Sequence, residues 1–160
     1  MHSYPVYTAM DVADCFVRLA LREGKPLTNM KVQKLTYIAY GYWLGFTNYQ
    51  LFQEAVEAWQ YGPVIRELYY QLAHYGANLI QQPLLSRNPI PENSDAYRLI
   101  ETVYDRYKDL TAGQLSWLTH QNDTPWSSTW NLMGNRKGII APDTIRDYYR
   151  DKMITREPAE

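Results

Sequence analysis

Helix start and stop signals recur along the whole sequence and divide it into short helical segments. Thr8 precedes Asp11 by three residues, as in a capping box. Thr124 precedes Pro125, a residue suited to a first helical turn, and Gly24 follows an apolar periodic stretch as a C-terminal glycine does. Apolar residues repeat at helical spacing between such signals. The expected helices cover residues 9–23, 29–46, 63–75, 95–108, 112–120, 125–133 and 142–153.

These segments predict a mainly α fold, a compact single-domain bundle of six or seven helices. The chain of 160 residues suits one domain, with its core over residues 8–153. A partial alternation of apolar and polar residues adds one short extended segment near residues 52–59. The proline-rich stretch 81–92 is interpreted as a long connection, and the tail 155–160 as a frayed end.

Charge and composition exclude several protein classes. The net charge of −1 leaves no general basic surface for nucleic acid, whose binding is therefore disfavoured. No apolar run approaches the roughly 18 residues of a membrane span, and the N-terminus lacks the features of a secretory signal. A single cysteine, Cys15, cannot form an intramolecular disulfide. We therefore expect a cytoplasmic protein with no membrane partner, and a homo-oligomer is left open.

Tyrosine is unusually abundant, with 15 Tyr and 5 Trp against 3 Phe. Tyr37, Tyr40 and Tyr42 lie on different faces of one expected helix, so we expect that they cannot all enter one core. In the adjacent pairs 69–70 and 148–149, one tyrosine of each pair is expected to face outward. Exposed tyrosines that cluster on one side would indicate an interface, because tyrosine is a frequent anchor at protein contacts.

Two lysines break a local rule in the expected helix 29–46. Lys31 and Lys34 lie in its first two turns, where the helix dipole disfavours cations. The simplest expectation is that Glu54 or Glu57 pairs with one of them, and the alternative is a functional role. Gln33 and Lys34 lie off the apolar stripe, so at least one of the two is expected to be exposed.

A search for catalytic chemistry finds no pattern that identifies an active site. Cys15 lies in an apolar stretch and is interpreted as a small buried hydrophobe. The three histidines, His2, His74 and His120, have no metal-binding spacing, and His120 is interpreted as a helix end. The basic turn 136–138 is too short to indicate a phosphate site. We assign no catalytic, cofactor-binding or metal-binding residue and expect a protein that is not an enzyme.

Three blocks of sequence carry a resemblance to a known family. Residues 27–39 read LTNMKVQKLTYIA, residues 57–64 read EAWQYGPV, and residues 118–120 and 125–126 read LTH and PW. In this order and spacing they resemble the Panacea antitoxin domain, also described as the SocA-like or phage-associated GepA-like family. The resemblance covers roughly residues 8–150.

This resemblance implies a small helical bacterial or phage protein that neutralises a toxin encoded beside it. Its partner would be that cognate toxin, bound by direct protein–protein contact. Two alternatives stay open: an adaptor that delivers the toxin to a cytoplasmic protease, and an enzyme that reverses the toxin's modification. The length of the match leaves no room for an added DNA-binding region.

The resemblance does not identify the contact surface, so the residues must suggest it. We hypothesise a toxin-binding surface built from the expected helices 29–46 and 63–75 and the turn 59–63. The alternative is that the turn only wedges against the first of these helices. The candidate partner-binding residues are Asn29, Lys31, Gln33, Lys34, Tyr37, Trp59, Tyr61, Arg66, Tyr69 and Tyr70.

Overall fold

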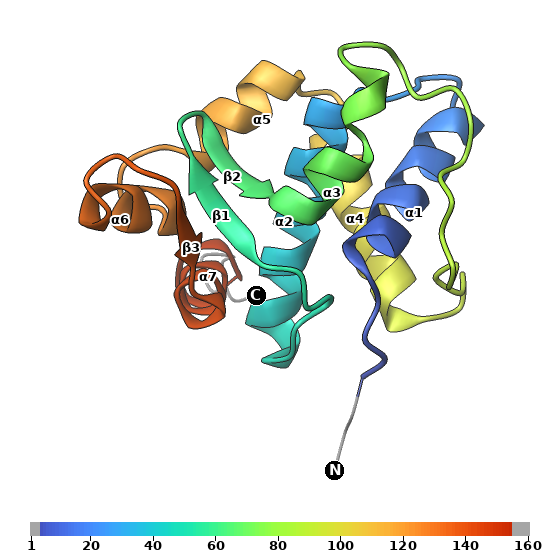
Figure 1. Ribbon diagram of the computed structural model, residues 1–160. Helices are drawn as coiled ribbons and strands as arrows, with labels where there is room; N and C mark the ends of the chain where they lie inside the picture. The colour runs from blue at the N-terminus through green and yellow to red at the C-terminus, as the bar shows by residue number, and fades with distance from the viewer. Residues whose placement is uncertain (1–3, 155–160) are drawn as a thin grey trace.

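One long helix, α2 (Asn29–Thr47), is the axis around which the other elements are arranged in the computed structural model (Figure 1). Helices α1, α3, α4, α5 and α7, the last turn η2 and strand β2 all contact it. This arrangement confirms the expected mainly α fold of a single domain with a core of packed helices.

The structure describes residues 4–154, so the expectation of a frayed end at 155–160 lies outside the described residues. The remaining elements are α1 (Ala9–Arg22), β1 (Val56–Trp59), β2 (Gly62–Ile65), α3 (Arg66–Gln71), η1 (Ala73–Tyr75), α4 (Asp95–Tyr107), α5 (Ala112–Thr119), α6 (Pro125–Leu132), β3 (Gly138–Ile140), α7 (Pro142–Tyr148) and η2 (Tyr149–Ile154). Within this described range, no helix has both the length and the apolar character needed to cross a membrane.

The central position of α2 corrects two expectations about its side chains. Residues 32–44 are buried without interruption, so the helix has no solvent-facing stripe. Gln33 and Lys34 are both buried, and Tyr37, Tyr40 and Tyr42 are all in the core. Helical spacing defines faces, but neighbouring elements cover every face of this helix.

A small antiparallel sheet replaces the first part of the expected helix 63–75. Its strand order is β2-β1-β3, and β1 confirms the extended segment expected near 52–59. A two-residue turn joins β1 to β2, with Trp59 opposite Gly62 in the register. Pro63 marks an edge strand here and not a helix start, because an edge strand tolerates the missing N–H. Helix α3 begins only at Arg66, and β3 was not predicted.

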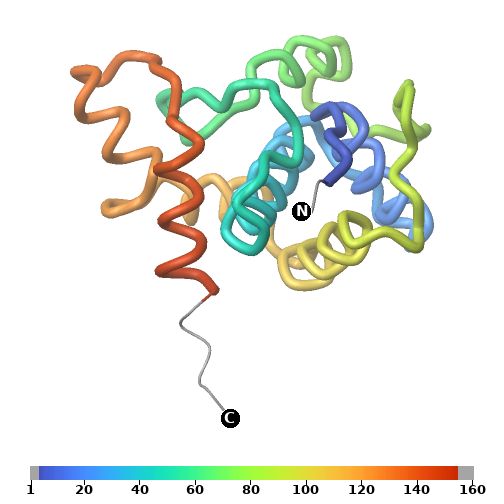
Figure 2. Tube along the Cα trace, turned by 90° about the horizontal axis from the view of Figure 1, so that it is seen from below, coloured from blue at the N-terminus to red at the C-terminus, as the bar shows by residue number. Residues whose placement is uncertain are grey.

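The connection 81–92 is held against α1 by two buried carboxylates. Asp14 Oδ1 accepts the Leu84 N–H at 2.8 Å, and Asp11 Oδ1 accepts the Ser86 hydroxyl at 2.6 Å. Figure 2 shows the connection, in yellow-green, running beside α1. These bonds give an irregular segment fixed polar partners, so it packs as part of the same domain.

We expect Asp14→Ala to destabilise the protein by about 1–2 kcal/mol, because it leaves the Leu84 N–H unsatisfied and removes the ion pair with Arg18. Urea denaturation measures this loss, and amide exchange at Leu84 should become faster. Asp105→Ala is the matched control, since Asp105 is exposed and its ion pair with Lys108 is long, at 3.9 Å. Equal stability of the two variants would contradict the anchoring role of Asp14.

Candidate functional site

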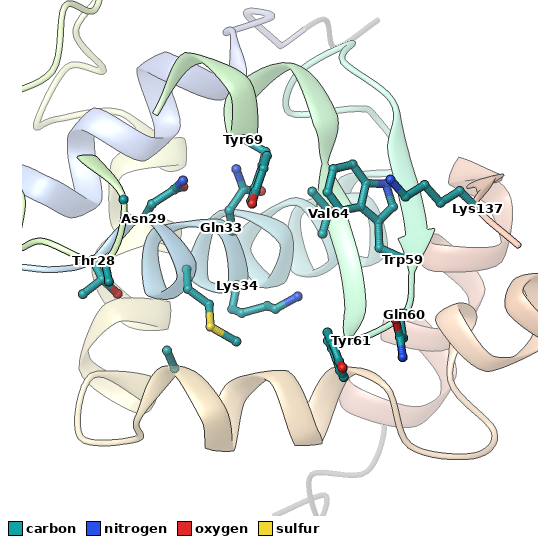
Figure 3. A pocket seen from close by; sticks show the side chains of 14 residues that line it. Thr28, Asn29, Gln33, Lys34, Trp59, Gln60, Tyr61, Val64, Tyr69 and Lys137 are labelled. Atoms are coloured by element: carbon teal, nitrogen blue, oxygen red, sulfur yellow. The ribbon is translucent and has the colours of Figure 1, made fainter. Parts of the chain in front are cut away.

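A groove of about 660 Å³ lies between the first half of α2, the β1–β2 hairpin, the segment after η1 and the start of α5 (Figure 3). Its walls are mainly apolar and aromatic, and its floor is the polar side of α2. The groove is lined by Thr28, Asn29, Met30, Gln33, Lys34, Trp59, Gln60, Tyr61, Val64, Tyr69, Gly76, Ala77, Ala112 and Lys137.

Lys34 lies at the floor of this groove with an unusual partner. Its ammonium donates to the Pro63 carbonyl oxygen at 2.8 Å, and the side chain is buried. No carboxylate among residues 4–154 forms an ion pair with Lys34 or with Lys31, whose ammonium donates to the Lys108 carbonyl oxygen, so the expected pairing of one lysine with Glu54 or Glu57 is wrong. Burial alone lowers the pKa of Lys34 to about 8, because desolvation disfavours the charged form.

The two glutamates that were expected to neutralise a lysine have other partners. Glu54 accepts the backbone N–H of Ala9 at 2.9 Å, at the start of α1. Glu57 accepts the indole N–H of Trp59 at 2.9 Å. Both carboxylates therefore stabilise nearby structure, and neither is a counter-ion for Lys34.

Gln33 and Asn29 add unsatisfied polar atoms to the same floor. Gln33 Oε1 accepts the Ile65 N–H at 3.2 Å, but Gln33 Nε2 is buried without a partner. Asn29 Oδ1 is also buried without a partner. The two residues are four apart on α2, so they lie on the same face of the helix. Among residues 4–154, the floor thus offers an unpaired amide NH2 group and an unpaired amide oxygen beside an ammonium.

The aromatic rim is held together by ring contacts. The Trp59 ring meets Tyr69 edge to face at 5.1 Å, and Tyr69 meets Tyr70 in the same way at 5.5 Å. The Lys137 ammonium lies 3.9 Å from the centroid of Trp59, which is a cation–π contact. Tyr61, at the tip of the hairpin, is 67% exposed. Together these side chains form an aromatic surface that is partly open to solvent.

The three sequence blocks that carried the family resemblance meet at this hairpin. Lys34 of the first block bonds the Pro63 carbonyl oxygen in the second block, and Gln33 bonds the N–H of Ile65, the residue that directly follows this block. Trp126 of the third block donates its indole N–H to the Trp59 carbonyl oxygen. The blocks are far apart in sequence, so their residues position one structure, the hairpin that forms the groove wall.

The groove gathers six of the ten candidate residues and leaves four outside. Asn29, Gln33, Lys34, Trp59, Tyr61 and Tyr69 line it. Arg66 and Tyr70 lie in an adjoining hollow with Glu57 and Glu67. Lys31 donates to the Lys108 carbonyl oxygen, and Tyr37 is buried against Tyr149, so neither belongs to the groove.

Exposed tyrosines gather mainly beside this groove. Tyr61, Tyr69 and Tyr70 are exposed around the hairpin and α3, while Tyr49 is exposed elsewhere, beyond the end of α2. Both tyrosines of the pair 69–70 face outward, whereas only one of them was expected to do so. Of the pair 148–149, the second is buried and the first half-buried.

Sequence reasoning did not identify several lining residues. Met30, Gln60, Val64 and Ala112 carried no chemical signal beyond their place in an expected helix or turn. Lys137 belongs to the basic turn 136–138, whose two adjacent charges are by themselves too few to indicate a site. Only the fold brings this turn over Trp59, since β3 pairs with β1 next to it.

The residues first considered for catalysis lie elsewhere. Cys15 is buried on α1, where burial and the nearby Asp14 carboxylate raise the pKa of its thiol to about 12. A protonated thiol is a poor nucleophile. His120 is the C-terminal cap residue of α5, as expected, and its ring lies beside Trp126. His2 lies outside the described residues.

Comparison with known proteins points to one family. The family model described as "Antitoxin SocA-like, Panacea domain" matches residues 32–127. The protein named Antitoxin SocA from Caulobacter vibrioides (strain NA1000 / CB15N) is 26% identical over 159 residues, which covers 92% of this chain and 85% of that protein. No solved structure gives a significant match. The matched segment includes both hairpin strands and the Lys34 end of the groove floor.

Proposed function

The chain belongs to the SocA-like Panacea antitoxin family, and from that premise we propose that it neutralises a toxin encoded beside it by direct binding. The relative named Antitoxin SocA supports the antitoxin role. The partner is a toxin protein, and the contact takes place in the cytoplasm. Neutralisation then needs a surface for the toxin and no catalytic group.

The main support for the location of the contact surface is the open aromatic groove, which forms where all three family blocks meet. Trp59, Tyr61 and Tyr69 present rigid, amphipathic area with few rotatable bonds, which makes such side chains effective anchors at protein interfaces. An exposed apolar patch of this kind on a small domain marks an interaction site more often than a scattered surface residue does. The groove and its rim therefore form the proposed toxin-binding surface.

The proposal is tested by co-expressing the chain with the toxin encoded next to it and scoring growth. We expect Tyr61→Ala to lose rescue, because the exposed ring at the hairpin tip contributes contact area while the fold depends on its backbone. That backbone stays anchored, since the Tyr61 carbonyl oxygen accepts the Ser116 hydroxyl at 2.6 Å.

Phe46→Ala is the matched control for this experiment. Phe46 is 61% exposed, close to the value for Tyr61, but it lies about 25 Å from Asn29 along α2. It should keep full rescue. Rescue by Tyr61→Ala at the wild-type level would exclude the hairpin as the interface. Measuring the toxin's half-life with and without the chain separates sequestration, which leaves it long, from delivery to a protease, which shortens it.

A further inference from the structure

The groove floor has the polar groups of a binding site without their partners. The Lys34 ammonium has three N–H donors, and the Pro63 carbonyl oxygen satisfies one of them. The neighbouring Gln33 Nε2 is buried and makes no hydrogen bond. Buried donors without acceptors are costly, so their persistence at one place points to a group that completes them on binding.

The charges of the groove lining indicate that this group is an anion. The groove lining contains two lysines, Lys34 and Lys137, and no aspartate or glutamate among the described residues. A buried ammonium without a counter-ion favours an anion that can share a charged hydrogen bond with it. A carboxylate can accept from the remaining Lys34 N–H groups, while the Gln33 amide, which points another way from α2, can donate to a carbonyl oxygen.

The remaining features fit a peptide better than a free acid. Asn29 Oδ1 is a buried acceptor one helical turn before Gln33, and it needs an N–H donor such as a backbone amide. Val64, Trp59 and Tyr69 line the side walls with apolar surface. Figure 3 shows the Gln33 side chain directed toward Tyr69 and the Lys34 side chain running along α2 toward the Tyr61 end of the hairpin. Apolar and aromatic groups also continue outward onto the exposed rim, at Met30 and Tyr61.

We propose that the groove binds an extended segment of the toxin in which an aspartate or glutamate side chain lies beside an apolar one. The carboxylate would accept from Lys34 Nζ, a backbone carbonyl oxygen would accept from Gln33 Nε2, a backbone N–H would donate to Asn29 Oδ1, and the apolar side chain would pack against Trp59 and Val64. This inference rests on the proposed antitoxin function and adds the chemistry that the toxin must present.

The test uses random short peptides displayed at the N-terminus of a phage coat protein and selected on the purified chain. In this format the peptides have no free C-terminus, so any selected carboxylate is an Asp or Glu side chain. We expect enrichment of an acidic residue next to an aromatic or aliphatic one. Selection on Lys34→Met should lose that acidic residue, and selection on Lys25→Met, which removes an exposed lysine, should keep it.

A synthetic copy of the selected peptide then tests the contact on the unaltered protein. Replacing its Glu by Gln, or Lys34 by Met in the chain, should each weaken binding by about tenfold or more, and combining the two should weaken it no further. Binding of the peptide should also raise the pKa of Lys34 above about 8, as followed by the NMR shift of its Cε. Selected peptides without acidic residues, or affinity unchanged by both replacements, would overturn the proposal.

The outcomes also separate this inference from the proposed function. If Lys34→Met still rescues growth in co-expression while Tyr61→Ala does not, the groove rim binds the toxin and the carboxylate contact is wrong. If neither variant loses rescue but the peptide binds as expected, the groove is a peptide site and the toxin binds elsewhere.

Discussion

Gly41→Ala is expected to destabilise the protein by about 3 kcal/mol or more, because its new methyl group enters a space that the Tyr149 ring already fills. A Cβ at Gly41 would lie 2.6 Å from Tyr149 Cζ and closer still to two other atoms of that ring. Tyr149 is buried and is held by ring contacts to Tyr37 and Tyr42. The ring therefore cannot move aside without opening the core.

The direction of this change is the opposite of the usual one. In a helix interior, alanine is favoured over glycine by about 1 kcal/mol, so most such replacements stabilise. Gly41 and Gly45 lie four apart on α2 and give η2 room to approach, since a Cβ at Gly45 would lie 3.0 Å from the backbone nitrogen of Arg150. The glycines thus allow the C-terminal segment 142–154 to pack against the central helix.

Gly113→Ala provides the matched control, because this glycine is also helical but its Cβ would meet only Thr111 Oγ1, at 3.8 Å. We expect that variant to be as stable as the wild type or slightly more stable in urea denaturation. Limited proteolysis of Gly41→Ala should cut first within residues 142–154. A Gly41→Ala protein with wild-type stability would show that the Tyr149 ring has room to move and that the close packing does not hold the segment.

Features that depend on neighbouring residues in sequence could be predicted, and the helix caps demonstrate this. A capping hydroxyl bonds an amide three residues ahead, so the signal and its partner lie in one short window. The hydroxyls of Thr8 and Thr124, the two threonines that marked helix starts, accept that bond in the structure, and Thr28, Ser94 and Thr111 accept it in the same way.

The strands β2 and β3 could not be predicted, because their stability comes from partners elsewhere in the chain. Val56 pairs with Ile65 on one side and with Ile140 on the other, and nothing in a local window reveals the second pairing. The burial of α2 could not be predicted from its sequence for the same reason. Its polar residues are typical of a solvent-facing surface. Only the fold shows that the hairpin packs over Gln33 and Lys34 and forms hydrogen bonds with them.

The candidate site shows the same contrast between residues that local sequence identifies and residues that only the fold brings together. The aromatic residues of the turn 59–63 could be predicted, because tyrosine and tryptophan in a turn are informative by themselves. The role of Lys34 could not, because the expected partner of a lysine is a carboxylate and its partner here is a backbone carbonyl. Gly62 makes this contact possible. Its φ of 122° suits glycine, and a Cβ there would lie 3.0 Å from Lys34 Nζ.

Lys34 should give the protein a characteristic dependence of stability on pH. Burial lowers its folded-state pKa to about 8, below the ordinary value of 10.5. Between these two values the unfolded chain binds more protons than the folded one, so the free energy of unfolding rises with pH. The cost of burying the ammonium is therefore fully present at neutral pH and is relieved as the lysine loses its proton.

We expect the wild type to gain about 2 kcal/mol of stability relative to Lys34→Met between about pH 7 and about pH 10. Urea denaturation of both proteins at a series of pH values measures this difference, and titrations that the two proteins share cancel in it. Methionine is the chosen replacement because it keeps the length and the apolar stem of lysine. An acidic residue at this buried position would place a carboxylate against the Pro63 carbonyl oxygen.

The control for this measurement is Lys25→Met, because Lys25 is exposed and its removal leaves the groove intact. Its stability should follow the wild type across the same pH range. A constant difference between the wild type and Lys34→Met would mean that the Lys34 ammonium is not desolvated in the folded protein. In that case the groove floor would hold an ordinary hydrated lysine, and the need for an anionic partner at this position would disappear with it.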